Sequence, residues 1–317
     1  MSATLVHSVA VMGTVVSFEV VGHDADEAQR AARQQAVDRA VDWFTYIEAA
    51  CSRFDPTSEL RRLVAGVGAP TVVSELLFEA VQFALAVADA TDGAFDPTVG
   101  RCMEARGFDR EHRTGALVAT PHSDAHASWR DVELDDAART ITLRRPLVLD
   151  LGAVAKGLAI DMAVRELVPF TDFAINAGGD LWLGGHNARG DAWTIGIRHP
   201  RDPARTVETV TVSNGAVCTS GDYERRSPSD TTQHHIVDPR AGASPAALAS
   251  VTVTAPSAMV ADALGTAAFV LGPEQGIALL ERHGVDGVCF TPALERFATA
   301  GFRSTHASLD GAFVSHA

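Results

Sequence analysis

The segment between residues 173 and 253 restricts the fold more than any other part of this sequence. It contains six short runs of strand-forming residues with turn signals between them. The runs are Phe173–Ala177, Leu181–Leu183, Trp193–Ile197, Thr206–Val212, His235–Val237 and Val251–Thr254. They predict a mostly antiparallel sheet in the middle of the chain.

Apolar residues at helical spacing occur on both sides of this segment. They predict one helix ending near Cys51 and others at about 74–90, 155–167, 257–271 and 273–283. The stretch from Val9 to Val21 is expected to be a strand with a bulge or a close backbone approach at Met12-Gly13-Thr14. Val285–Phe290 is expected to be a closing strand, and the polar stretch from Arg110 to Asp136 a surface excursion.

The 317 residues show no internal repeat and no Pro- or Ser-rich linker. Helices and strands therefore belong to one continuous unit rather than to two domains joined by a tether. We predict an α/β (α+β) fold of two interleaved lobes, a mostly antiparallel sheet packed with helices. Residues 1–300 are expected to form this single domain and 301–317 a C-terminal tail.

Charge and composition exclude several classes of protein. Twenty-six basic residues against 40 acidic ones give a net charge of −14, which repels nucleic acid and anionic membranes. No stretch approaches the ~18 apolar residues of a membrane span, and the first ten residues do not resemble a signal peptide. The four cysteines form no C-x-x-C pair. The sequence thus predicts a cytoplasmic protein without membrane insertion, whose anionic ligand needs a local countercharge.

Lys156 is the only lysine among the 26 basic residues. It follows an apolar run, Leu147–Leu151, that is expected to be a buried strand carrying Asp150 near its end, and it lies in the first turn of a predicted helix. A helix N-terminus beside an ammonium group suits a phosphate-bearing ligand, although the P-loop motif is absent. The alternative is that Asp150 caps a turn and Lys156 is solvated.

Three further clusters combine glycine with polar side chains. The loop Thr91–Thr98 follows a helix and could be a simple helix stop with Phe95 in the core. Loops at Asn176–Asp180 and Thr219–Glu224 come with His234–Arg240, where His235 could be a base or a structural histidine. Asp262 and Thr266 share one face of an apolar helix, and their oxygens suit Mg²⁺. The alternative is that Asp262 forms hydrogen bonds with the nearby backbone and Thr266 only packs.

Taken in chain order, these motifs resemble the ApbE family of FAD:protein FMN transferases from about residue 9 to 290. The resemblance rests on Met12-Gly-Thr14, Ser52-Arg-Phe-Asp-Pro56, Asp92-Gly-Ala-Phe-Asp-Pro-Thr98, Asp150-Leu-Gly-x-x-Ala-Lys-Gly157, Asn176-Ala-Gly-Gly179, Thr219-Ser-Gly221, His235-Ile-x-Asp-Pro-Arg-x-Gly242 and Ala261-Asp-x-x-x-Thr266. The sequence departs from the family where Phe54 stands in place of a frequent tyrosine and Ala241 in place of a threonine. Many members also carry an export signal.

The resemblance implies an enzyme that transfers FMN from FAD to a threonine or serine hydroxyl of an acceptor redox protein, releasing AMP. It implies an FAD site formed by Met12, Phe54, Ala94, Phe95, Asp96, Asp150, Lys156 and Ile236. It also implies an Mg²⁺ site formed by the Ala153 carbonyl, Asp262 and Thr266.

The residues are compatible with this chemistry, and they leave alternatives open. A metal ion with Lys156 can neutralise charge on the phosphates, and His235, supported by Asp238 or water, is the expected general base, with Asp262 as its competitor. An FAD pyrophosphatase that gives FMN and AMP, or a flavin-binding protein without turnover, would use the same groups.

Overall fold

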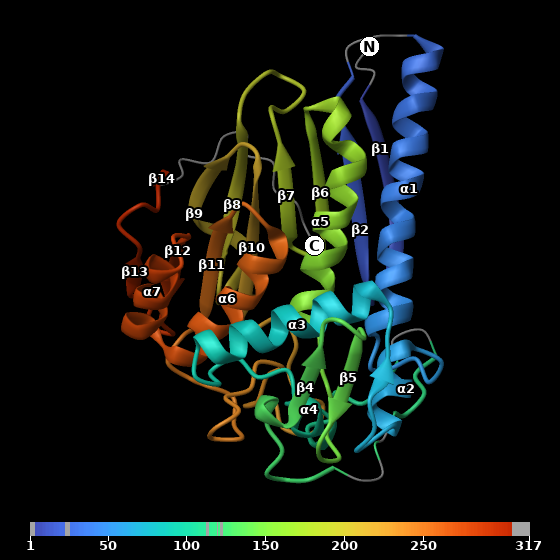
Figure 1. Ribbon diagram of the computed structural model, residues 1–317. Coiled ribbons are helices and arrows are strands. Elements are labelled where there is room, and N and C mark those ends of the chain that lie inside the picture. The colour runs from blue at the N-terminus through green and yellow to red at the C-terminus, as the bar shows by residue number, and fades with distance from the viewer. Residues whose placement is uncertain (1–3, 23–25, 112–113, 119, 121–122, 306–317) are drawn as a thin grey trace.

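An eight-stranded antiparallel sheet forms the centre of the protein (Figure 1). The computed structural model describes residues 4–22, 26–111, 114–118, 120 and 123–305. In sheet order the strands are β1 (Leu5–Val11), β2 (Thr14–Val20), β6 (Phe173–Ala177), β7 (Asp180–Gly184), β10 (Gly215–Gly221), β11 (Ser250–Ala255), β12 (Asp286–Phe290) and β13 (Arg296–Ala298). The predicted sheet is thus confirmed, and its strands come from both ends of the chain as well as the middle.

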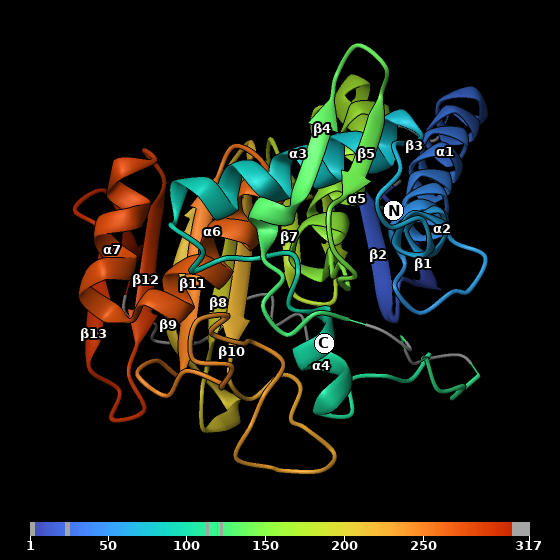
Figure 2. The same ribbon diagram turned by 60° about the horizontal axis from the view of Figure 1, so that its bottom comes forward.

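Helices cover one face of this sheet and a small second sheet covers part of the other (Figures 1 and 2). The helices are α1 (Glu27–Cys51), α3 (Glu75–Ala90), α5 (Gly152–Leu167), α6 (Ala258–Leu271) and α7 (Pro273–Arg282). The second sheet contains β8 (Trp193–His199), β9 (Asp202–Val212) and β14 (Ser304–Thr305). Alternate side chains of β6 point to opposite faces of the main sheet. Phe173 and Ile175 belong to the core between this sheet and the helices, whereas Ala174 packs against the core between the main sheet and the second sheet.

The second lobe is inserted between β2 and β6. It holds α2 (Glu59–Ala65), β3 (Thr71–Val72), α4 (Gly100–Ala105), η1 (Trp129–Asp131), β4 (Val132–Asp135) and β5 (Thr140–Leu143). The three strands form a sheet in the order β3-β5-β4. The short 3-10 helix η2 (Val168–Phe170) follows α5. Because the strands of the main sheet enclose this lobe in the sequence, the lobes are interleaved, as expected.

The five predicted helices match α1, α3, α5, α6 and α7 closely, but several local predictions were wrong. The strand expected over Val9–Val21 is a hairpin, β1 and β2, joined by Met12 and Gly13 with φ of 52° and 71°. Both residues have positive φ, which is typical of the two-residue turns that connect twisted antiparallel strands. The polar stretch 110–136 contains β4, so it is in part a sheet strand; residues 112–113, 119 and 121–122 lie outside the described residues.

Two apolar runs are buried without being strands. The four apolar residues of Leu147–Leu151 are buried, but the backbone of this run bonds to the α3–α4 loop and to the start of α4. The N–H of Gly100 donates to Val148 O, and the N–H of Asp150 donates to Pro97 O. His235–Val237 buries Ile236 and Val237, yet it belongs to no sheet. The N–H of His235 donates to Arg225 O, next to an isolated bridge between Arg226 and His234. Burial produced the apolar pattern in both runs, and neighbouring loops replaced the ladder partners.

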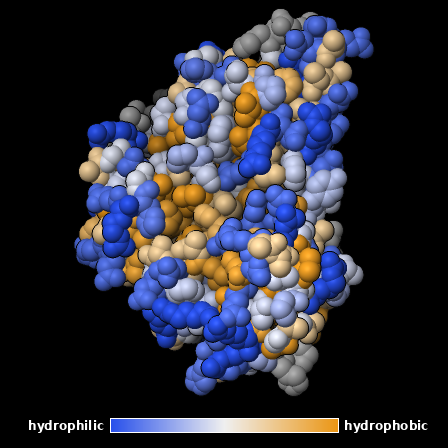
Figure 3. Space-filling view, viewed as in Figure 1, coloured by the Kyte–Doolittle hydropathy of each residue, from blue (hydrophilic) through white to orange (hydrophobic). Residues whose placement is uncertain are grey.

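The last described residues pack against the second sheet. Phe302 is buried there and β14 pairs with β9, while 306–317 lie outside the described residues. The division of the chain at residue 300 therefore stays a prediction. Figure 3 shows apolar surface gathered over α6 in the middle of the helical face, with mostly hydrophilic surface around it.

Candidate active site

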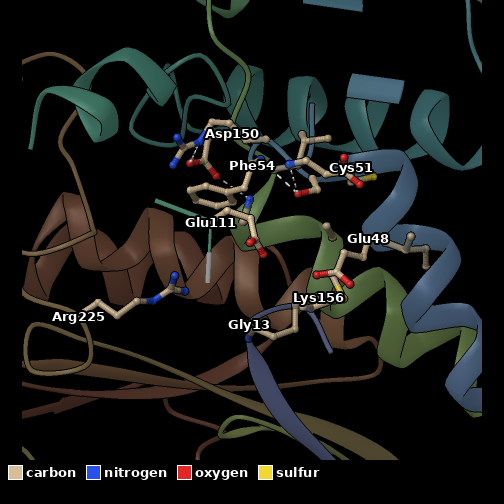
Figure 4. Close-up of a pocket in the computed structure, with 16 residues that line it drawn as sticks. Gly13, Glu48, Cys51, Phe54, Glu111, Asp150, Lys156 and Arg225 are labelled. Atoms are coloured by element: carbon tan, nitrogen blue, oxygen red, sulfur yellow. Dashed lines mark hydrogen bonds and ion pairs between the residues drawn. The ribbon is translucent and has the colours of Figure 1, made fainter. Parts of the chain in front are cut away.

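A pocket opens where the two lobes meet, between the end of α1, the start of α5 and the β1–β2 turn (Figure 4). Four of the predicted flavin-site residues line it: Met12, Phe54, Asp150 and Lys156. Arg225 enters from the opposite side, and Glu48 and Glu111 also lie at its wall. Residues from five distant parts of the sequence therefore form one cavity.

Asp150 and Arg53 form the rigid wall of this pocket. The Arg53 Nε donates to Asp150 Oδ2 at 3.0 Å, and the N–H of Gly152 donates to Asp150 Oδ1 at 2.8 Å. Burial raises the pKa of Asp150, but the charge of Arg53 and these hydrogen bonds outweigh it, so that the pKa lies below its usual value. Asp150 is thus a charged structural anchor as well as a lining residue. The guanidinium of Arg53 also lies 4.3 Å from the ring centre of Phe54 and orients this ring at the pocket wall.

A tight turn between β6 and β7 places a carboxylate against Lys156. Gly178 and Gly179 form this turn with φ of 63° and 98°, a conformation that residues with a Cβ rarely adopt. Asp180 directly follows this turn, is buried, and forms an ion pair with the Lys156 ammonium. The lysine is therefore held by a carboxylate from the main sheet and not solvated.

Close contact between α5 and α6 brings the second carboxylate into place. A Cβ on Gly157 would lie 2.4 Å from Met259 Cα, so only glycine allows the two helices to approach this closely. Asp161 of α5 accepts hydrogen bonds from Ser257 Oγ, Ala258 N and Met259 N at the start of α6. This contact fixes α6 so that Asp262 Oδ2 lies 3.8 Å from Lys156 Nζ.

Asp262 is buried without adequate partners. Its Oδ2 atom is shielded from solvent and has no hydrogen-bond partner among the described residues. Burial raises the pKa of Asp262 against the opposing charges of Lys156 and Arg225. A buried carboxylate oxygen without a hydrogen bond is costly, which suggests a ligand that the protein chain itself does not supply.

The residues predicted to share a magnesium ion with Asp262 have suitable chemistry, and their meeting at one ion stays a prediction. Thr266 lies one helical turn after Asp262 on α6, and its hydroxyl is a second hard oxygen. Ala153 departs from helical geometry inside α5, with φ −94° and ψ 15°, which rotates its carbonyl away from the helical direction. No group of three His, Cys, Asp or Glu side chains suited to a metal occurs in the described residues. One carboxylate with a hydroxyl and a carbonyl is a donor set that Mg²⁺ accepts, because it retains several waters.

His235 lies near this cluster, although it does not line the pocket. Burial lowers its pKa to about 3, and the charges of Arg225, His234 and Lys156 add to this effect. Its Nδ1 atom is buried and has no hydrogen-bond partner among the residues described. The expected support from Asp238 is not seen, because Asp238 Oδ1 instead accepts bonds from the backbone and side chain of Arg240. His235 is thus neutral at physiological pH.

Four predicted flavin-site residues lie outside the pocket wall. Ala94, Phe95 and Ile236 are buried in the main core. Asp96 Oδ1 accepts bonds from the backbone and hydroxyl of Thr98, and burial raises its pKa. The loop that carries Ala94, Phe95 and Asp96 nevertheless contacts the site, since Pro97 O accepts the N–H of Asp150. Their assignment to the flavin site stays a prediction.

Comparison with known proteins decides the family. The model of the ApbE family matches residues 12–289, almost the whole described chain. This chain belongs to the ApbE family. A FAD:protein FMN transferase of Salmonella typhimurium is 32% identical over 290 residues, covering 86% of this chain and 80% of that protein. One from Treponema pallidum is 35% identical over 286 residues, covering 81% of this chain and 77% of that protein.

Solved ApbE structures have the same fold. The ApbE protein of Thermotoga maritima superposes with a TM-score of 0.81 at 27% identity, covering 94% of this chain and 97% of that one. The flavin transferase ApbE of Vibrio cholerae has a TM-score of 0.80 at 25% identity and covers 95% and 99%. As for the membrane, none of the helices formed by the described residues has the length and apolar character needed to span one.

Three residues of this ApbE site were missed by the sequence reasoning. Asp180 is the last residue of the motif Asn176–Asp180, and its place directly after two glycines could have marked it as a site residue. Arg53 lies inside a quoted motif, but its pairing with Asp150 joins positions 97 residues apart. Arg225 follows the loop Thr219–Glu224, and nothing in the local sequence marks it as facing the pocket.

Proposed function

We propose that this chain is an Mg²⁺-dependent flavin transferase. In this reaction it moves FMN from FAD to a threonine or serine hydroxyl of an acceptor protein through a phosphodiester bond, and releases AMP. The observation that carries the proposal is the buried Asp262, with an oxygen that lacks a hydrogen bond, 3.8 Å from the Lys156 ammonium at the pocket. The names of the Salmonella and Treponema relatives support the coarser part of this proposal, the transfer of FMN from FAD to a protein.

The pocket suits the two ends of FAD in different ways. The Phe54 ring, held by Arg53, gives a flat apolar surface for a flavin ring. Lys156, Arg225 and the backbone amides at the start of α5 supply positive charge for the pyrophosphate. The protein's net charge of −14 makes this local positive charge essential for an anionic substrate.

The transfer step follows from this placement. The acceptor's hydroxyl oxygen attacks the phosphorus on the FMN side and forms a new O–P bond. The bond between that phosphorus and the bridging oxygen breaks, and AMP leaves with the electron pair. Lys156 stabilises the negative charge that develops on the phosphate oxygens. Asp262, Thr266 and the Ala153 carbonyl are the residues that would hold Mg²⁺, which would supply further charge neutralisation when bound.

The hydroxyl proton needs an acceptor, and His235 remains our proposal for it. Burial keeps the imidazole neutral, so that a ring nitrogen has a free lone pair at physiological pH. Asp262 is the weaker candidate, because a carboxylate that binds a metal ion has little basicity left. The low pKa of His235 also makes it a weak base in the ligand-free protein, and desolvation is the cause.

The acceptor and the compartment belong to the same proposal. A flavin-dependent redox protein is the acceptor class that the resemblance to the family implies, and we do not expect nucleic acid as a partner. We place the reaction in the cytoplasm. The four cysteines support this, since all are free thiols and three are buried.

The experiment incubates the purified protein with FAD and MgCl₂, with and without a soluble extract of its own cells as the source of acceptor. Chromatography measures AMP and FMN, and flavin fluorescence in a denaturing gel detects labelled protein. We expect AMP together with a fluorescent acceptor band. AMP with free FMN and no band would indicate the pyrophosphatase instead, and no product would indicate a flavin carrier.

The Asp262→Ala variant tests the metal assignment in the same assay. Loss of this carboxylate should reduce AMP release by about 10²–10³-fold, the usual effect of removing a group that stabilises the transition state. Asp172→Asn is the matched control, because Asp172 lies at the other end of the β6–β7 hairpin, away from Lys156. Full activity of Asp262→Ala would refute the metal site.

A further inference from the structure

Asp180, Lys156 and Asp262 form a buried group of three charges. Lys156 Nζ pairs directly with Asp180 Oδ2, whereas its distance to Asp262 Oδ2 is 3.8 Å, beyond hydrogen-bond range. The side chains of the lysine, Asp180 and Asp262 are 20%, 6% and 12% exposed. The lysine therefore lies between two carboxylates and is bonded to one of them.

This asymmetry decides which carboxylate is neutralised by Lys156 and which one can bind a cation. These three groups by themselves carry a net charge of −1, and the charge of Arg225 also acts on Asp262. Asp180 uses the ammonium, and its position is fixed by the Gly178-Gly179 turn and by pairing within β6 and β7. The unneutralised charge then falls on Asp262, whose Oδ2 has no hydrogen bond among the described residues.

We propose that Asp180 is a positioning residue that holds Lys156 and thereby keeps Asp262 free to bind a divalent cation. This inference rests on the proposed function, because it takes Asp262 to be the metal ligand. Without Asp180, the ammonium has one carboxylate of the described residues left within 4 Å, that of Asp262. The ammonium would then pair with the Asp262 carboxylate and compete with the metal ion for it.

The competition predicts a specific pattern of variants. In Asp180→Asn, if about nine molecules in ten pair Lys156 with Asp262, the apparent dissociation constant for metal rises about tenfold. Removing the competitor as well, in Asp180→Asn with Lys156→Met, should restore the affinity to within about threefold of the wild type. The rescue arises because the apparent affinity depends on the fraction of sites that are free. Asp180→Glu, which keeps a carboxylate, should bind metal nearly as well as the wild type.

The dissociation constant is measured without any turnover by titrating the full-length protein with Mn²⁺ and monitoring the electron paramagnetic resonance signal of free Mn²⁺. Asp172→Asn again serves as the control, and circular dichroism confirms that each variant is folded. Asp262→Ala should abolish the binding that the wild type shows.

The outcomes separate the two hypotheses. If Asp180→Asn binds Mn²⁺ as tightly as the wild type, or if the double variant stays as weak as the single one, the role of Asp180 is wrong. The proposed function then still stands, provided that the wild type releases AMP from FAD. If the wild type releases no AMP, the function fails whatever the Mn²⁺ titrations show. If the wild type binds no Mn²⁺, the metal site and the role of Asp180 fail together.

Discussion

Asp161 and Asp262 lie at the same interface between α5 and α6, and they are bonded in opposite ways. Asp161 accepts three hydrogen bonds from the first turn of α6, at 2.6, 2.8 and 3.0 Å. Asp262 lies further along α6, and its buried Oδ2 has no hydrogen bond among the described residues. Two aspartates in one helix pair thus differ mainly in how completely the protein satisfies them.

The difference separates a structural carboxylate from a functional one. Burial raises the pKa of both side chains, but hydrogen bonds from Ser257, Ala258 and Met259 oppose this for Asp161. Asp161 therefore supports the start of α6 in the free protein. Asp262 costs stability there, and the cost is explained if the carboxylate is kept for a ligand.

Substitution of each aspartate should break or confirm this contrast. Asp161→Ala leaves the first N–H groups of α6 without acceptors, so we expect the free energy of unfolding to fall by about 2–4 kcal/mol. Asp262→Asn removes a poorly satisfied charge, so we expect no loss beyond about 0.5 kcal/mol, or a gain. Urea unfolding followed by tryptophan fluorescence measures both. An equal loss in the two variants would show that Asp262 is structural too.

His235 provides a second test of the same idea, through the dependence of stability on pH. Its pKa is about 3 in the folded protein, against 6.5 for an ordinary histidine side chain. Between these values the unfolded chain binds a proton that the folded protein does not, so that stability falls as the pH falls. The slope is about 1.4 kcal/mol per pH unit for one such group.

We therefore compare the wild type with His235→Gln at pH 7 and pH 5. The wild type should lose about 2 kcal/mol more than the variant on acidification, because the glutamine does not titrate. Burial also lowers the pKa of His234, which contributes in the same direction and remains in both proteins, so the difference isolates His235. The same loss in both proteins would mean that the imidazole is not buried in its neutral form.

Helical periodicity predicted the scaffold of the site well, and it failed where contacts are distant in sequence. Asp262 and Thr266 could be paired from the sequence because they are one turn apart on a helix. Asp180 meets Lys156 only through the packing of a β-hairpin on α5, so no local pattern marks the pair. The hairpin at Met12 was predicted as a single strand with a bulge, because two strands joined by a two-residue turn give almost the same apolar pattern as one long strand.

The single lysine permits the most direct test of whether FAD reaches this charged group. A lysine-directed acylating reagent can modify only Lys156 and the amino terminus, and mass spectrometry of peptides distinguishes the two. The Lys156 side chain is 20% exposed and lines the pocket.

With FAD and Mg²⁺ at about ten times the dissociation constant, about one site in ten stays free, so that labelling of Lys156 should slow by about tenfold. The amino terminus should react at an unchanged rate and serves as the internal reference. Equal labelling of Lys156 with and without FAD would place the phosphates elsewhere, and the contrast between Asp161 and Asp262 would then have no bearing on the flavin.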